Sequence, residues 1–166
     1  MCADRAATIL ARFNSAHNDL VWKLRDCAFD SAPSSRGDGW SAAQIGTHVA
    51  MTNDFVAAVL TGKTPMAQPA PDGFQESFNP SVLPAKAQAP AVLQPPAVVG
   101  IDAAIERLRA SAQNVSKAIA GLTPERGSQY CVSMPFGTLS LFELADFTAA
   151  HVSRHAAQVQ RTVARA

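Results

Sequence analysis

Three histidines are spaced so that they could bind one metal ion. His151 and His155 lie four residues apart, and on a helix this spacing stacks two side chains on one face, one turn apart. That face also carries Leu144 and further apolar residues at steps of three or four, so both imidazoles are predicted to point inward. His48 follows Ile45 on the apolar stripe of another predicted helix. Three neutral imidazoles that converge between helices suit Zn, Ni, Fe or Cu, and they leave a coordination position open for water or substrate.

The alternative is that these histidines are ordinary core residues. A buried histidine is often satisfied by a single hydrogen bond, and an i, i+4 pair of histidines also arises by chance. His48 favours the metal site, because three buried imidazoles would otherwise each need a polar partner. The fourth histidine, His17, lies off the apolar stripe of its helix or at its edge, so we expect it at the surface.

Four other side chains are candidates for a supporting role. Asp54 and Asp146 are the nearest carboxylates in sequence, but neither is in helical register with a histidine, so we expect solvated or capping groups. Cys131 could reach the mouth of the site, although a small apolar residue packed under a loop is the commoner fate of a cysteine. Gln158 comes three residues after His155 and either orients its imidazole or is an ordinary polar residue. The catalytic residues themselves stay undetermined.

Four amphipathic helices are predicted to position these residues. The first three span about residues 4–28, 41–62 and 102–122, and the fourth runs from residue 140 toward the C-terminus. The second and fourth begin with capping boxes, Ser41 with Gln44 and Ser140 with Glu143, in which each residue's side chain bonds the other's backbone N–H. The segment from Gly127 to Gly137 is expected to be irregular or a short hairpin.

The segment 63–100 is predicted to be a long crossover on the surface. It holds eight of the eleven prolines, a density that no helix survives. Phe74, Phe78, Val82 and Leu83 could attach it to the helices. We therefore predict an all-α fold, a bundle of four helices that forms one domain over residues 1–166.

Composition excludes several classes of function. Fourteen basic residues against thirteen acidic ones leave no global field that would attract nucleic acid or anionic lipid. No run of residues is long and apolar enough to cross a membrane or to form a signal peptide. The three cysteines show neither a disulfide framework nor a zinc ribbon, which fits a reducing compartment. We expect a soluble, cytoplasmic protein.

The motifs resemble those of a known family. Trp40-Ser41 leads to His48, Phe136-Gly137-Thr138-Leu139 precedes the last helix, and His151-x-x-x-His155-x-x-Gln158 lies on it. This pattern resembles the DinB/YfiT-like metalloenzymes along nearly the whole chain. The resemblance implies a four-helix up-down bundle with the long crossover between its second and third helices. It also implies a divalent metal held by His48, His151 and His155, with nickel or zinc as the first candidates and iron or manganese next. Many relatives carry a second adjacent histidine where this chain has Arg154.

The resemblance also suggests an activity. The family includes enzymes similar to mycothiol-dependent maleylpyruvate isomerases and bacillithiol transferases, in which the metal activates a low-molecular-weight thiol. We therefore expect a metal-dependent thiol S-transferase, or a hydrolase that activates water, acting on a small-molecule substrate. Relatives often pair, so a homodimer is also considered. The alternatives are a non-catalytic binding or scaffold protein stabilised by its metal and linked to stress, or a carrier of apolar ligands.

Overall fold

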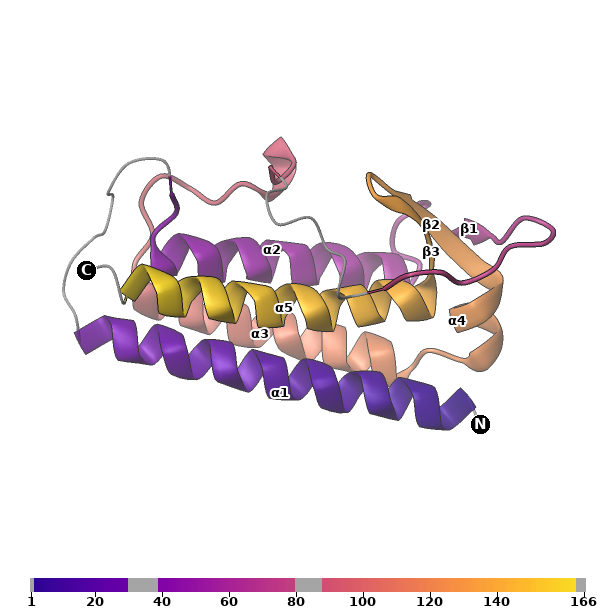
Figure 1. Cartoon of the computed structure of the whole chain (residues 1–166), viewed down its shortest axis with the longest axis horizontal. Coiled ribbons are helices and arrows are strands. Elements are labelled where there is room, and N and C mark those ends of the chain that lie inside the picture. The colour runs from indigo at the N-terminus through magenta and orange to yellow at the C-terminus, as the bar shows by residue number, and fades with distance from the viewer. Residues whose placement is uncertain (1, 30–38, 80–87, 164–166) are drawn as a thin grey trace.

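Four long helices lie side by side in the computed structural model, which describes residues 2–29, 39–79 and 88–163 (Figure 1). These helices are α1 (Cys2–Phe29), α2 (Ala42–Leu60), α3 (Ile101–Ala120) and α5 (Leu141–Val163). The short helix α4 (Pro124–Gln129) connects α3 to a small antiparallel sheet of β1 (Gln68–Pro69), β2 (Tyr130–Met134) and β3 (Gly137–Ser140). The sheet and α4 lie at the end of the molecule where α1 and α5 begin. The described part of the chain is therefore mostly helical.

The helices do not alternate in direction as a simple up-down bundle would. Along α2 and α3 the contacting residues rise together, from Gly46 beside Ala104 to Asn53, which donates a hydrogen bond to Ser111. These two helices are therefore parallel, and the expected alternation is wrong. The crossover explains this arrangement, because it returns the chain to the end of the bundle where α2 began. Its 3-10 turn η2 (Ala91–Leu93) accordingly lies beside the first half of α2.

Both predicted capping boxes are present. Ser41 Oγ accepts from the backbone N–H of Gln44 at 3.2 Å, and Gln44 Oε1 accepts from that of Ser41 at 2.9 Å. At the start of α5, Ser140 Oγ accepts from the backbone N–H of Glu143 at 3.0 Å, and Glu143 Oε2 accepts from that of Ser140 at 2.9 Å. Each box satisfies N–H groups that the first turn of a helix leaves without intrahelical partners. The capping boxes thereby fix where α2 and α5 begin, and these two helices carry the three histidines.

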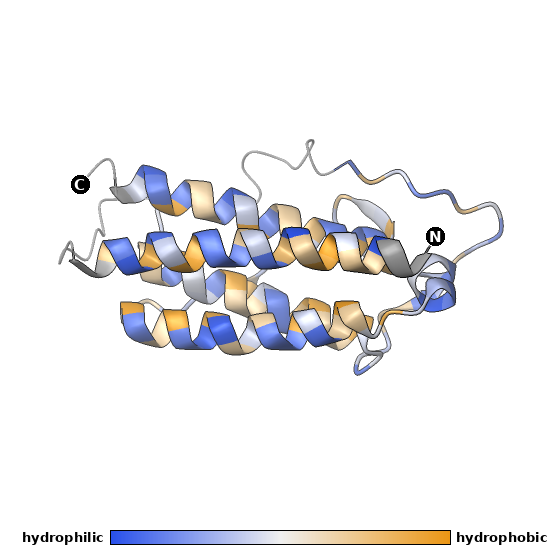
Figure 2. Ribbon diagram, turned by 90° about the horizontal axis from the view of Figure 1, so that it is seen from below, coloured by the Kyte–Doolittle hydropathy of each residue, from blue (hydrophilic) through white to orange (hydrophobic). Residues whose placement is uncertain are grey.

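The long helices are amphipathic, and blue and orange segments alternate along them in Figure 2. Their apolar faces meet in one cluster of buried side chains that includes residues from all four. The largest fully buried side chains include Phe13, Phe142, Ile9, Leu20, Leu24 and Ile45. None of the helices in the described ranges is long and apolar enough to cross a membrane.

The sheet is the main element that the all-α expectation did not contain. Of the two structures considered for residues 127–137, the short hairpin is closer, since β2 pairs with β3 from Cys131↔Ser140 to Met134↔Gly137. β1 adds a two-residue strand from the crossover. Elsewhere on the crossover, the Phe78 ring lies 6.2 Å from that of Phe147, which attaches this segment to α5. Val82 and Leu83 lie outside the described residues.

Candidate metal centre

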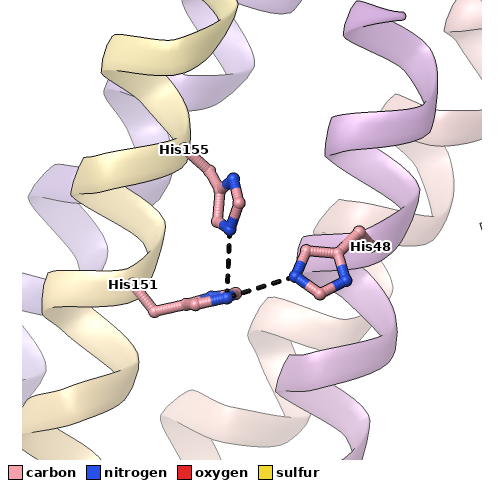
Figure 3. A group of neighbouring side chains, drawn as sticks. All are labelled: His48, His151 and His155. Atoms are coloured by element: carbon pink, nitrogen blue, oxygen red, sulfur yellow. Dashed lines mark hydrogen bonds between the residues drawn. The ribbon is translucent and has the colours of Figure 1, made fainter. Parts of the chain in front are cut away.

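The three predicted histidines converge on one point between α2 and α5 (Figure 3). The Nε2 atom of His151 lies 3.3 Å from Nε2 of His48 and 3.1 Å from Nε2 of His155. One nitrogen from each imidazole lies within 4.8 Å of the other two. His48 and His155 are buried, and His151 is partly buried. The inward orientation predicted from the apolar stripes is therefore what the structure has.

The separations between these nitrogens fit a transition-metal site. Zinc binds histidine nitrogens at about 2.0–2.1 Å, so two ligands of a tetrahedral ion lie about 3.3–3.4 Å apart. The two separations from His151 Nε2, 3.3 and 3.1 Å, are close to this value. Three imidazoles also leave a fourth position for an exogenous ligand. The cluster could hold one divalent ion.

Hydrogen bonds fix the tautomers of two of the three imidazoles. His48 Nδ1 lies 2.8 Å from the backbone carbonyl oxygen of Leu93, and His155 Nδ1 lies 2.7 Å from Oε1 of Gln158. Both partners are acceptors, so each Nδ1 carries the proton and each Nε2 presents a lone pair. These bonds are of the kind that orients metal-binding histidines in proteins. Gln158 therefore takes the orienting role that was one of its two interpretations.

A cation would resolve an electrostatic conflict among the three rings. The Nε2 lone pairs of His48 and His155 both point at Nε2 of His151, which can donate one proton at most. The Nδ1 atom of His151 is buried and has no hydrogen-bond partner among the described residues. A proton on either nitrogen of His151 therefore leaves a lone pair or an N–H poorly satisfied. A divalent ion would accept all three Nε2 lone pairs at once.

All three imidazoles are held in the neutral form that a metal requires. Burial lowers the pKa of His48, although its bond to Leu93 acts in the opposite direction. Burial, followed by the charges that His155 and His48 would carry, holds the pKa of His151 well below its usual value. Burial, and then the neighbouring His48, lowers the pKa of His155 to about 4. Protons therefore do not compete for these nitrogens at neutral pH.

A cavity of about 200 Å³ lies against the three histidines. Its walls come from α2, α5, the crossover and the turn between β2 and β3, and they are mainly apolar. Trp40 packs on His48 with 4.8 Å between ring centroids, and Phe147 lies 5.5 Å from His151. The coordination position left open by the three imidazoles can therefore be occupied by a ligand seated in this cavity.

His17 was expected at the surface, and this prediction is wrong. Its side chain is buried, and Nε2 lies 3.3 Å from the carbonyl oxygen of Leu108 on α3. It stacks on Phe13, whose ring centroid lies 6.2 Å away. The edge of the α1 stripe is covered because α1 packs between α3 and α5. His17 belongs to the helix packing and not to the group of three.

The remaining candidates lie away from the histidines. Asp54 is exposed and accepts a hydrogen bond from Asn114, while Asp146 forms an ion pair with Arg12 of α1. Cys131 is buried on β2, and burial raises the pKa of its thiol. None of the three joins the group that could hold a metal among the described residues. Asp54 and Cys131 have the roles that the sequence favoured, whereas Asp146 is neither solvated nor a capping group, because it pairs α5 with α1.

Sequence reasoning missed one functional group, the backbone carbonyl of Leu93. It belongs to η2, inside the proline-rich crossover, and it is 45 residues from the histidine that it orients. A backbone oxygen has no signature in residue type, and the crossover offers no periodicity that would place it. Trp40 was noticed as part of the motif that leads to His48, and the packing of its ring on His48 is an additional role.

A comparison with family models finds a match over most of the chain. The model of the DinB superfamily matches residues 6–159. That range covers all four long helices almost completely and includes the three histidines. No curated protein and no solved structure matches the chain significantly.

Proposed function

The chain belongs to the DinB superfamily, and we propose that it is a single-domain, four-helix-bundle metalloenzyme with His48, His151 and His155 as its metal ligands. Its activity is that of a thiol S-transferase or a hydrolase, with a thiol or a water molecule as the nucleophile. The observation that carries this proposal is the convergence of three Nε2 atoms, two of them held as lone-pair donors by Leu93 and Gln158.

Each part of the site has a distinct task. A divalent ion at this position would lower the pKa of a thiol or water bound to it, which supplies a nucleophile at neutral pH without a separate base. The three imidazoles hold that ion without adding negative charge, so its acidity is retained. Trp40 and Phe147 cover the histidines and keep bulk water away from the reacting atoms.

The number of ligands favours an enzyme over a structural metal site. Structural zinc sites are usually closed by four protein ligands, whereas catalytic ones keep a position open. The described residues supply three, and a cavity lies on the open side. The same cavity supports a second candidate function, a carrier of apolar ligands, because its walls are mainly apolar. A carrier would bind its ligand equally well after the metal is removed.

Elemental analysis of untagged protein tests the metal site. We expect close to one equivalent of divalent metal, nickel or zinc before iron or manganese, in the wild type and none in His151→Ala. His17→Gln is the matched control, because it removes a buried histidine that lies outside the group, and it should keep its metal. Circular dichroism would verify that both variants are folded. A wild type that stays metal-free after incubation with Zn or Ni would refute the metal centre and leave the carrier.

A further inference from the structure

The cavity over the histidines has a wall of aromatic and other apolar side chains. Trp40 and Phe55 come from α2 and the residue range just before it, and Met134, Phe136 and Phe147 come from the hairpin and α5. Phe147 and Phe136 pack together, with 5.1 Å between their centroids, so they form a continuous aromatic surface. Such a wall favours a flat apolar body, because aromatic rings attract one another in offset or edge-to-face geometry.

The volume of the cavity limits the size of that body. Pockets for drug-sized ligands usually measure about 300–1,000 Å³. An apolar cavity of about 150 Å³ holds one benzene molecule. The cavity here, about 200 Å³, therefore has room for one aromatic ring with a small substituent. A larger molecule would have to extend out of it.

The charges around the cavity favour an anion. No aspartate or glutamate is among the described residues that line it, and its one permanently charged residue is Arg154. A divalent ion on three neutral histidines would add two positive charges. Apolar walls weaken the screening of these charges, so a ligand that brings one negative charge to the ion gains more than a neutral one.

We propose that this cavity binds a small aromatic monoanion, one ring that carries a carboxylate or a thiolate, with the ring between Phe136 and Trp40 and the anionic atom toward the histidines. This inference rests on the proposed metal site and names the class of ligand that the site takes. Carboxylate and thiolate share the chemistry that the site recognises, which is a negative donor atom attached to a ring. A thiolate would be the nucleophile of the transfer reaction, and a carboxylate would occupy the same position as an inhibitor.

Titration of Co(II)-loaded protein with four simple probes tests the ligand class. The probes are benzoate, benzenethiolate, acetate and benzyl alcohol. Their binding is monitored through the visible absorption of the cobalt ion and by calorimetry. We expect at least one of the two aromatic anions to bind about tenfold tighter than acetate, which lacks the ring, and than benzyl alcohol, which lacks the charge. The two arms, benzoate and benzenethiolate, show which donor atom the site prefers. If acetate or benzyl alcohol binds as well as both aromatic anions, the inference is wrong.

A pair of phenylalanine variants tests the position of the ring. Phe136 is 40% exposed at the turn between β2 and β3, so Phe136→Ala should fold normally. We expect it to weaken the binding of the preferred aromatic anion about three- to tenfold and to leave acetate unchanged. Phe74→Ala is the matched control, because Phe74 is a partly buried crossover residue that does not line the cavity. Equal effects of the two variants, or no effect of Phe136→Ala, would contradict the placement of the ring.

The metal content of the same samples separates the two proposals. Protein that takes up no cobalt refutes the metal centre itself. Protein that holds cobalt but does not favour aromatic anions refutes only the ligand class. Metal-free protein should bind benzoate and benzenethiolate at least tenfold more weakly, and equal affinity without metal would show that the anion does not face the ion.

Discussion

Removal of the Gln158 amide should weaken metal binding without disturbing the fold. Gln158 Oε1 lies 2.7 Å from Nδ1 of His155, one turn away on α5. Gln158→Ala removes this acceptor and leaves the three imidazoles in place. His155 is then free to take either tautomer, and its Nδ1–H is left without its partner in a buried environment.

The expected loss of affinity can be estimated in two ways. Loss of the partner of a buried N–H costs about 1–3 kcal/mol when nothing replaces it. Part of this cost also falls on the metal-free protein, where the imidazole can turn toward water, so only the remainder weakens metal binding. Removal of such a supporting hydrogen bond usually lowers metal affinity about 10–100-fold, which corresponds to about 1.4–2.7 kcal/mol. We expect a loss of at least tenfold.

Competition with a chromophoric zinc chelator measures this loss directly. Gln160→Ala is the matched control, because Gln160 is the same residue type on the same helix but is exposed. It should bind zinc as the wild type does. Gln158→Glu should retain or increase the affinity, since a carboxylate is a stronger acceptor for Nδ1–H. Wild-type affinity in Gln158→Ala, or an equal loss in Gln160→Ala, would refute the view that this bond tunes the site.

Two further predictions concern stability. Burial lowers the pKa of His17 below its ordinary value of 6.5, so the unfolded chain binds a proton more readily, and the wild type should lose stability as the pH falls below about 6.5. Between pH 7.5 and 5.5, His17→Gln should lose less free energy of unfolding than the wild type, as measured by urea denaturation with a chelator present. Equal losses in the two proteins would exclude His17 as the cause. A Cβ atom at Gly127 would lie 2.3 Å from the Phe142 ring, so Gly127→Ala should cost about 1–3 kcal/mol of the free energy of unfolding. At Gly121 the nearest atom would be 3.4 Å away, so Gly121→Ala should unfold at nearly the wild-type urea concentration, and equal midpoints for both variants would contradict the predicted clash.

The sequence predicted the helices well because their signals are local. The capping boxes at Ser41 and Ser140 fixed two helix starts, and regular apolar steps defined the faces that the structure buries. The same steps placed His48, His151 and His155 inward on two helices. Family resemblance, confirmed by the match to the DinB superfamily, supplied the link between the two helices.

The features that the sequence did not predict depend on contacts distant in the chain. The parallel arrangement of α2 and α3 depends on the path of the crossover, and residue types do not encode a path. β1 is only two residues long and pairs with β2 more than 60 residues later, at Gln68↔Cys131, so no strand pattern could reveal it. The burial of His17 depends on how closely α3 and α5 pack around α1. Each case is decided by tertiary packing and not by local propensity.

The contact between Leu93 and His48 has a consequence for the order of events during folding. It joins residues 45 positions apart, and the contact between His48 and His151 joins residues 103 positions apart. Long-range contacts of this kind form late, because the chain must first close large loops at a cost in entropy. The three nitrogens therefore meet only after α2, the crossover and α5 have docked. An ion bound by them would stabilise the native state and not the folding transition state. Its binding would therefore slow unfolding and leave the rate of folding nearly unchanged.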